Sequence, residues 1–127
     1  SGMPRLYREA PLNSIWEGSG NVTALDVLRA VTREPDSLDA VLAEIDLAAG
    51  ADEWFDRAVH ELRIELRSRE ERRARRLSEM LALCLQGSLL LRFAPEEVGR
   101  AFVASRFLPD GPWRTPGTLP AEAHIDA

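Results

Sequence analysis

The sequence contains no lysine, and all sixteen of its basic side chains are arginines. It has a single cysteine, Cys84, so an intramolecular disulfide is excluded. A lone cysteine inside an apolar run usually packs as a small hydrophobic residue. The two histidines, His60 and His124, lie far apart and have no ligand-like spacing to Cys84. We therefore expect neither a metal site nor a thiol nucleophile.

Long hydrophobic runs are also missing. No stretch of eighteen apolar residues occurs, so the sequence offers no candidate membrane span. The first residues lack a basic segment followed by an apolar one, so no secretory signal is expected, and a reducing, cytoplasmic setting is the prediction. The formal net charge of −5 argues against a protein that binds nucleic acid over its whole surface.

What the sequence does contain is helical periodicity. Its 127 residues, 45% of them hydrophobic, match one globular domain with a core of its own. Apolar residues recur at helical spacing, and no alternating strand pattern is long enough to indicate a strand. The predicted helices cover about 21–32, 37–49, a segment from Asp52 that either continues or breaks near Ser68, 70–92, and a segment from Pro95.

Local signals place the ends and faces of these helices. Asp36 or Ser37 is expected to cap the second helix, and Gly50 is suited to follow its end. Residues 77–91 are apolar on most sides, which predicts a central, buried helix. Small residues in that helix, Gly87 and Ser88, are expected to let a neighbour approach closely. The predicted inward faces are Val22, Leu25, Leu28 and Val31 in the first helix, and Val98, Ala101 and Phe102 in the last.

These elements indicate an all-α protein, an antiparallel helical bundle of four to five helices within residues 1–107. Prolines and glycines crowd the sequence from Pro109 onward and exclude a regular helix there. We therefore expect residues 108–127 to form an irregular or disordered tail.

A carboxylate flanked by an aromatic residue and glycines precedes the first predicted helix, in the segment Asn13-Ser14-Ile15-Trp16-Glu17-Gly18-Ser19-Gly20-Asn21. Two interpretations fit Glu17. Next to apolar Trp16, a partly desolvated carboxylate would have a raised pKa and suit a general base. Alternatively, Ser14 and Glu17 match the spacing of a capping box, in which the glutamate only satisfies a backbone N–H group.

The same segment resembles a known family. Arg8-Glu9-Ala10 followed by Ile15-Trp16-Glu17-Gly18-Ser19 is similar to the acyl-CoA dehydrogenase signature Arg-Asp-Ala…Ile-Tyr-Glu-Gly-Thr. The wording Met-Pro-Arg-Leu-Tyr-Arg-Glu…Asn-Ser-Ile-Trp-Glu-Gly-Ser-Gly-Asn…Leu-Asp-Val-Leu-Arg resembles the AidB-like, alkylation-response branch of that family. The resemblance covers roughly residues 3–107 and is specific over the first twenty-nine.

The resemblance implies roles for individual residues. Glu17 would be the base that removes the α-proton of an acyl-CoA thioester while a hydride passes to FAD. Gly18, Ser19 and Asn21 would stand on the cofactor side, Ser19 in place of the family's threonine and Asn21 where a glutamine often stands. Trp16 replaces the usual tyrosine and would narrow an acyl pocket.

The resemblance also implies that the chain is the C-terminal helical domain of a longer flavoprotein, because the family has two further domains that help to bind FAD. We therefore expect the 127 residues alone to bind no FAD and to be inactive. A bundle that lacks neighbouring helices would expose apolar surface, so we expect a homo-oligomer.

A second notable segment holds seven arginines and four glutamates within residues 61–76, a net charge of +3. Glu65–Arg69 and Glu71–Arg75 have the spacing of helix-surface ion pairs, which is typical of a solvated face. The alternative is a phosphate-binding patch, and the AidB-like resemblance implies double-stranded DNA as the partner. The candidate contacts are Arg69, Arg72, Arg73 and Arg76.

Overall fold

The computed structural model describes residues 20–109, which form five α-helices and one 3₁₀ turn without a β-strand in that range. The all-α helical bundle predicted from the sequence is thereby confirmed. The elements are α2 (Gly20–Arg33), α3 (Pro35–Asp46), α4 (Glu53–Ser68), η1 (Glu71–Arg73), α5 (Ala74–Phe93) and α6 (Glu96–Arg106).

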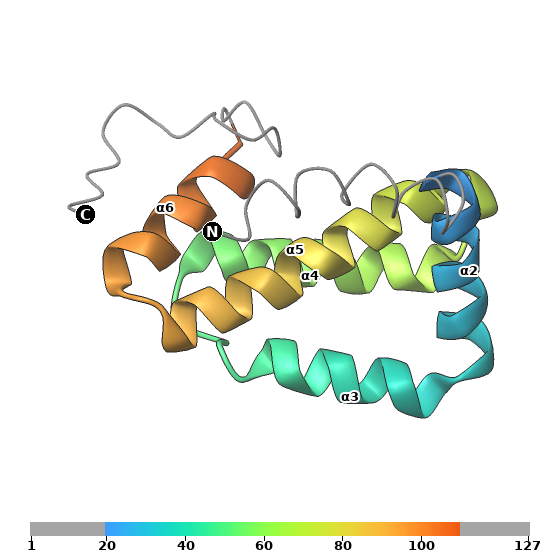
Figure 1. Ribbon diagram of the computed structural model, residues 1–127, viewed down its shortest axis with the longest axis horizontal. Coiled ribbons are helices and arrows are strands. Elements are labelled where there is room, and N and C mark those ends of the chain that lie inside the picture. Colours follow the sequence, from blue (N-terminus) through green and yellow to red (C-terminus); the bar gives the residue numbers. More distant parts are fainter. Residues whose placement is uncertain (1–19, 110–127) are drawn as a thin grey trace, which may run out of the picture.

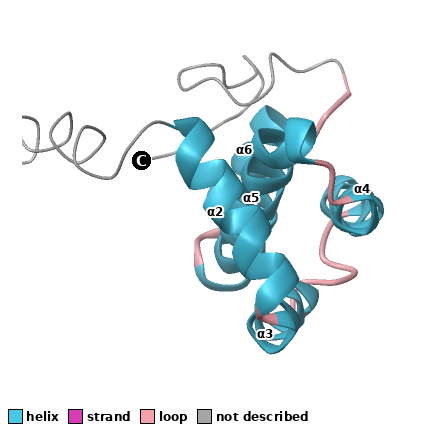
Figure 2. Cartoon of the chain, turned by 90° about the vertical axis from the view of Figure 1, so that its right-hand side faces the viewer, coloured by secondary structure: helices cyan, strands magenta, loops and turns pink. Residues whose placement is uncertain are grey.

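Helix α5 is the centre of the arrangement. Helices α3, α4 and α5 run along the long axis of the molecule, and α2 stands across them at one end (Figure 1). Viewed from that end, α3 and α4 are seen nearly end-on while α2 crosses in front (Figure 2). Helices α2, α3, α4 and α6 all pack against α5. This position confirms the prediction that the helix with the most apolar circumference is the central one.

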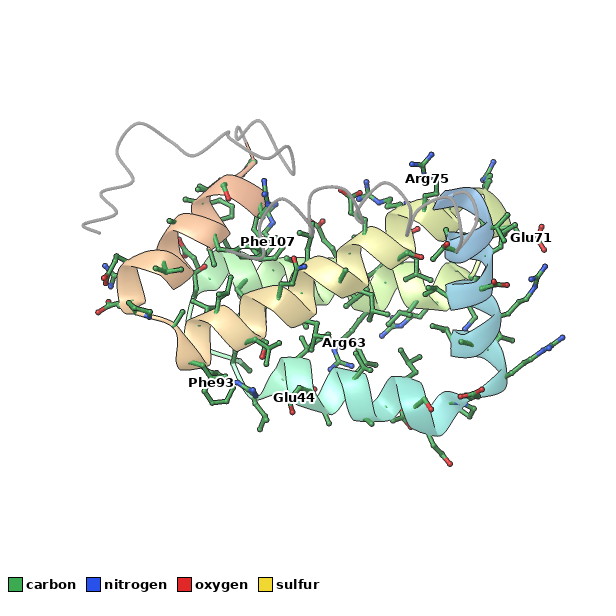
Figure 3. The ribbon with its side chains drawn as sticks, viewed as in Figure 1. Glu44, Arg63, Glu71, Arg75, Phe93 and Phe107 are labelled. Atoms are coloured by element: carbon green, nitrogen blue, oxygen red, sulfur yellow. The ribbon has the colours of Figure 1, made fainter. Side chains whose placement is uncertain are left out.

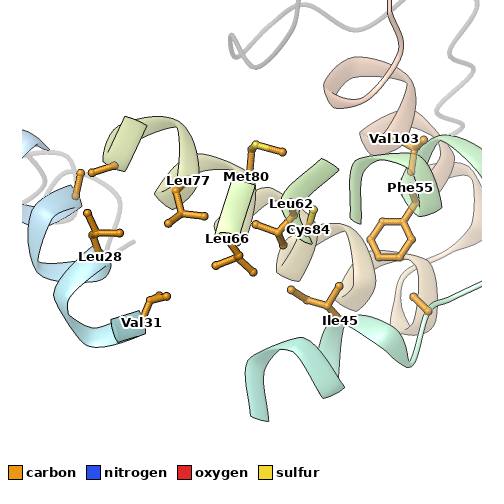
Figure 4. Close-up of a cluster of buried hydrophobic side chains, with 13 residues drawn as sticks. Leu28, Val31, Ile45, Phe55, Leu62, Leu66, Leu77, Met80, Cys84 and Val103 are labelled. Carbon is orange, nitrogen blue, oxygen red and sulfur yellow. The ribbon is translucent and has the colours of Figure 1, made fainter. Parts of the chain in front are cut away.

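The core lies where these helices meet α5 (Figure 4). Phe55, Ile45 and Leu62 are completely excluded from solvent, and the thiol of Cys84 is buried beside them. The buried position of Cys84 confirms its expected role as a small core residue. The other buried apolar side chains of the cluster are Ala24, Leu28, Val31, Ala48, Leu66, Ala74, Leu77, Met80 and Val103.

Several helix ends are where the sequence places them. The carboxylate of Asp52 accepts hydrogen bonds from the backbone N–H groups of Trp54 and Phe55 at 2.8 and 3.1 Å and so caps α4. Gly50, at φ +83°, occupies the left-handed region in the turn after α3, but it does not directly follow the helix as predicted, because α3 ends at Asp46 with Leu47 as its C-cap. Of the two possibilities left open near Ser68, the break is the one observed, because Arg69 leaves the helix at φ 48°.

Other boundaries were predicted wrongly. Helix α3 begins at Pro35 and ends at Asp46, and neither Asp36 nor Ser37 caps it; the Ser37 hydroxyl bonds the carboxylate of Glu34 instead. A proline at the first helical position needs no N–H partner, so the helix starts earlier than the polar residues suggest. The predicted helix 70–92 is divided, because residues 71–73 form the 3₁₀ turn η1 before α5 begins.

Two inward faces also differ from the prediction. In α2, Ala24 is buried beside Leu28 and Val31, whereas Val22 is half exposed. In α6 the buried residues are Gly99, Ala101, Val103 and Ser105, whereas Val98 and Phe102 are only half-buried. Small residues let α6 lie close to α5, because a Cβ on Gly99 would lie 3.3 Å from backbone atoms of Leu90 and Leu91.

The small residues of α5 do admit close neighbours. A Cβ on Gly87 would lie 3.1 Å from ring atoms of both Phe55 and Phe107, so the two aromatic rings use the space that glycine leaves. Those rings meet edge to face with centroids 6.2 Å apart. The neighbouring Ser88 is fully buried and contacts α3. The prediction for both residues is confirmed.

Candidate functional site

The proposed catalytic segment lies almost entirely outside the described residues. Glu17, Gly18 and Ser19 precede residue 20, so neither the general-base nor the capping-box interpretation of Glu17 meets a structural test. Asn21 belongs to the first turn of α2. The roles that the resemblance implies for these four residues stay predictions.

The structure does fix the element that follows this segment. Helix α2 begins at Gly20, three residues after Glu17, and packs on α5 through Ala24, Leu28 and Val31. Because the aligned peptide dipoles give a helix a positive amino-terminal end, the start of α2 favours negative charge next to it. Its first turn holds no acidic residue that would already balance this charge.

The arginine-rich segment occupies the end of α4, the turn η1 and the start of α5 (Figure 3). At its centre lies Glu65, a carboxylate that is only 6% exposed. Arg73 Nε lies 2.7 Å from Oε1 of Glu65, and Arg76 Nε lies 3.5 Å from Oε2. Two guanidinium groups from η1 and α5 therefore hold one buried carboxylate of α4.

The contact to Oε1 is an ion pair but not a well-aligned hydrogen bond, because this buried oxygen has no hydrogen-bond partner of good geometry. A buried carboxylate without its opposite charges would be strongly unfavourable. We infer that Arg73 and Arg76 are held in place mainly to compensate Glu65, and that their contact joins α4 to the η1–α5 segment.

Both surface pairs predicted from spacing are absent from the described residues. Glu65 contacts Arg73 and Arg76 rather than Arg69, because the chain leaves the helix at Arg69 and the i, i+4 relation no longer applies. Glu71 and Arg75 form no ion pair and point apart in Figure 3, since Glu71 belongs to the 3₁₀ turn and Arg75 to α5.

The other two candidate phosphate contacts also have local partners. Arg72 Nε donates to Oε2 of Glu70 at 2.6 Å, and the pair lies at the surface. This hydrogen bond, together with the charge of Arg72, lowers the pKa of the Glu70 carboxyl below its ordinary value. Arg69 Nε donates to the backbone carbonyl of Leu66 at 3.2 Å. In each case the terminal Nη atoms are not used by these bonds.

Sequence spacing did not reveal the role of Glu65. Its partners follow it by eight and eleven residues, and the break at Arg69 lies between them, so no helical periodicity links the three. The only available signal was the presence of an acidic residue between Ile64 and Leu66, next to the apolar stripe of α4.

One cavity beside the core is small. It lies between α4, α5 and the residues after α6, has a volume of about 110 Å³, and is lined by Trp54, Met80, Cys84 and Phe107 among others. Pockets that hold small-molecule ligands usually measure roughly 300–1,000 Å³. The cavity is therefore too small for an acyl-CoA thioester.

Two expected absences concern only the part of the chain that the structure covers. Among residues 20–109, no group of three histidine, cysteine or acidic side chains is arranged to hold a metal ion. None of the helices described there is both long and apolar enough to cross a bilayer.

Comparison with known proteins gives one informative match. The chain is 40% identical over 102 residues to the putative acyl-CoA dehydrogenase AidB of Escherichia coli K12. The match covers 80% of this chain but 19% of that protein, so the chain spans about a fifth of its relative. No protein-family model matches the chain. The resemblance predicted from the motif is confirmed by this match.

Proposed function

Because the chain is AidB-like over four fifths of its length, we propose that it is the C-terminal helical region of an acyl-CoA dehydrogenase-like flavoprotein. The identity of 40% over 102 residues is the observation that carries this proposal. In the reaction proposed for the longer protein, a base removes the α-proton of an acyl-CoA thioester and the β-hydride passes to FAD.

Glu17 is the proposed base. The motif Ile15-Trp16-Glu17-Gly18-Ser19 aligns it with the family's catalytic glutamate, and a carboxylate can act only if it comes within hydrogen-bond reach of the α-proton. Gly18, Ser19 and Asn21 are proposed to face the cofactor. The described helices contribute a rigid support, because α2 follows the motif directly and is packed on α5.

The experiment uses the longer protein that carries this chain, purified with FAD. Addition of an acyl-CoA thioester is expected to bleach the flavin absorbance near its visible maximum in the native protein, and Glu17→Gln is expected to slow bleaching by at least about 100-fold, the usual contribution of a general base. Glu53→Gln, at an exposed acid in the first turn of α4, is the matched control. Bleaching that survives Glu17→Gln would exclude Glu17 as the base.

The 127-residue chain by itself is proposed to be colourless and inactive, since the resemblance implies that other domains of the longer protein contribute much of the FAD site. Flavin absorbance that stays with the purified chain through gel filtration would contradict this proposal.

A second function is supported by the arginine-rich segment, namely binding of double-stranded DNA. The observation in its favour is that Arg73 and Arg76, which contact Glu65, belong to the same short segment of η1 and the start of α5 as the exposed Arg72 and Arg75. Guanidinium groups bind phosphate oxygens through two N–H donors at once.

Binding of a 20-base-pair duplex should weaken as salt rises, because neutralised phosphates release counterions. Arg72→Gln should lower the slope of log K against log salt by about 1, the effect of losing one phosphate contact. Arg100→Gln in α6, where Arg100 pairs with Glu96, is the control and should leave the slope unchanged. If no duplex binds at 20 mM salt, the chain does not use this segment for DNA.

A further inference from the structure

An open groove separates α3 from α4. Both helices pack on α5, but they do not pack extensively against one another. The groove between them has a volume of about 530 Å³ and is lined by Leu38 and Leu42 of α3 and by Arg63, Leu66, Arg67 and Arg69 of α4 and its end. The α3 wall therefore contributes leucines, and the α4 wall contributes one leucine and three arginines.

The floor of the groove is apolar. Leu66 is almost completely buried, and Leu38 and Leu42 are half-buried, so part of each leucine of α3 remains open to solvent. A phosphate backbone gains nothing from leucine side chains, and no aromatic ring lines the groove to stack on a base. An apolar face on the partner would bury this floor and gain roughly 25 cal/mol per Å² of apolar surface.

The rim of the groove is cationic. Arg63 is already neutralised, because its Nη2 lies 2.6 and 2.7 Å from the two carboxylate oxygens of Asp46, and Figure 3 shows it extending toward α3. Arg67 and Arg69 form no ion pair with any residue in the range 20–109. Two uncompensated positive charges thus stand at one end of the groove in a chain whose net charge is −5.

Arg69 is held in an unusual conformation. It is the single non-glycine residue with positive φ within the described range, at φ 48° and ψ 30°, where a side chain costs about 1–2 kcal/mol relative to the right-handed region. Its Nε donates to the carbonyl of Leu66, which leaves the two Nη groups as a fork at the groove. Strained residues of this kind cluster at binding and switch sites.

We propose that the α3–α4 groove binds an acidic amphipathic helix of a partner protein. Apolar side chains at i, i+3 or i+4 and i+7 of that helix would lie on Leu38, Leu42 and Leu66, as in other helix-in-groove complexes. Carboxylates beside the apolar stripe would accept hydrogen bonds from Arg67 and Arg69. This inference rests on the described residues alone and does not depend on the proposed flavin chemistry.

The test measures binding of an 18-residue helical peptide with leucines at i, i+3, i+4 and i+7 and glutamates on both flanks. Fluorescence anisotropy of the labelled peptide with the full 127-residue chain should show saturable binding. Arg67→Glu combined with Arg69→Glu should weaken binding at least tenfold, which corresponds to about 1.4 kcal/mol. Leu38→Asn, on the floor of the groove, should weaken it by a similar factor.

The matched control is the double variant Arg57→Glu with Arg100→Glu, which reverses the same number of charges at exposed arginines outside the groove. Because neither residue lines the groove, this variant should bind the peptide with its affinity changed less than about twofold. A peptide with lysines in place of the glutamates should not bind. Circular dichroism of every variant should show the helical content of the native chain.

Each of the following results would overturn the proposal. The first three are no binding of the acidic peptide at 200 µM, equal binding of the lysine peptide, and loss of peptide binding in the control variant. The last is displacement of the peptide by a 20-base-pair duplex whose own binding is unchanged by Leu38→Asn. The last result would identify the arginines as phosphate contacts. If sedimentation shows that the chain is a dimer and that the groove substitutions dissociate it, the groove binds a second copy of the chain instead.

Discussion

Ser88 donates its hydroxyl to the backbone carbonyl of Glu44 at 3.0 Å and so joins the middle of α5 to α3 across forty-four residues of sequence. Two contacts from Arg92 reinforce the same point: its Nη1 lies 3.4 Å from that carbonyl and its Nη2 lies 2.5 Å from the Glu44 carboxylate. Helix α3 is therefore attached to α5 by polar contacts as well as by Ile45 in the core.

Ser88→Ala should lower the free energy of unfolding by about 1 kcal/mol, because it removes one buried hydrogen bond while Arg92 still reaches the carbonyl. Urea denaturation followed by circular dichroism measures this change. The control is Ser78→Ala, whose hydroxyl bonds the Ala74 carbonyl within its own helix and whose loss should be smaller. Equal losses of unfolding free energy in the two variants would mean that the hydrogen bond between α3 and α5 stabilises the fold no more than a hydrogen bond within one helix.

The contact of Glu65 with Arg73 and Arg76 should contribute strongly to stability. Arg73→Ala with Arg76→Ala leaves a buried carboxylate uncompensated, and the free energy of unfolding should fall by about 2 kcal/mol. This value lies below the roughly 3–5 kcal/mol of a fully buried pair because both arginines are partly exposed. Urea denaturation gives the value.

Adding Glu65→Gln to that double variant should restore part of the loss, because the neutral side chain needs no opposite charge. The control is Arg72→Ala with Arg75→Ala, which removes two exposed arginines of the same segment and should change stability by less than about 0.5 kcal/mol. If this control lost as much stability as Arg73→Ala with Arg76→Ala, the number of arginines removed would matter rather than the buried carboxylate of Glu65.

The titration of Glu70 should report on Arg72. The hydrogen bond and charge of Arg72 lower the pKa of the Glu70 carboxyl, so the contact stabilises the folded chain above the ordinary glutamate pKa and is lost as pH falls through the lowered value. Arg72→Gln should return the pKa toward that of a free glutamate, as measured by ¹³C NMR of the side-chain carboxyl.

The same signal tests the DNA proposal. If a phosphate takes Arg72 away from Glu70, the pKa of Glu70 should rise when duplex DNA is added. If the pKa of Glu70 does not change at saturating DNA, Arg72 does not contact the phosphates.

Self-association should depend on the apolar surface near the end of α5. Phe93 is 76% exposed and Leu47, in the turn after α3, is 66% exposed. Arg92 lies over the Phe93 ring at 4.6 Å and does not cover it. Burial of one such aromatic side chain is worth roughly 1.5–3 kcal/mol, so Phe93→Ser should weaken an oligomer at least about tenfold.

Sedimentation equilibrium at several concentrations measures the dissociation constant. Val22→Ser, which removes an exposed apolar side chain from α2, is the control and should leave association unchanged. If the native chain stays monomeric at 0.5 mM, the proposed homo-oligomer does not form through this chain.

Much of the fold could be predicted because it follows from local chemistry. Phe55, Leu62 and Leu66 repeat at helical spacing and are all buried, and Asp52 caps the helix they belong to. Gly50 turns the chain where only glycine does so without strain, and the apolar helix is the central one. Each of these signals is contained within a few neighbouring residues.

The arrangement of charges could not be predicted in this way. The contacts of Glu65 depend on the reversal at Arg69, a left-handed residue that helix propensity does not indicate. The groove beside Leu38 and Leu66 depends on how α3 and α4 pack against α5. The spacing of residues within one helix does not reveal this packing. For Glu17 the sequence provides more than the structure does. The family resemblance supplies the hypothesis for its role, and the residues that the structure describes begin after Glu17.

The central position of α5 has a consequence for how the bundle opens. Helix α6 rests chiefly on α5, so it can detach without separating the remaining helices, whereas release of α5 removes the support of all four. The amide hydrogens of α6 should therefore exchange with deuterium at a rate set by local detachment of this helix. The amides of α5 should take it up only when the entire molecule unfolds.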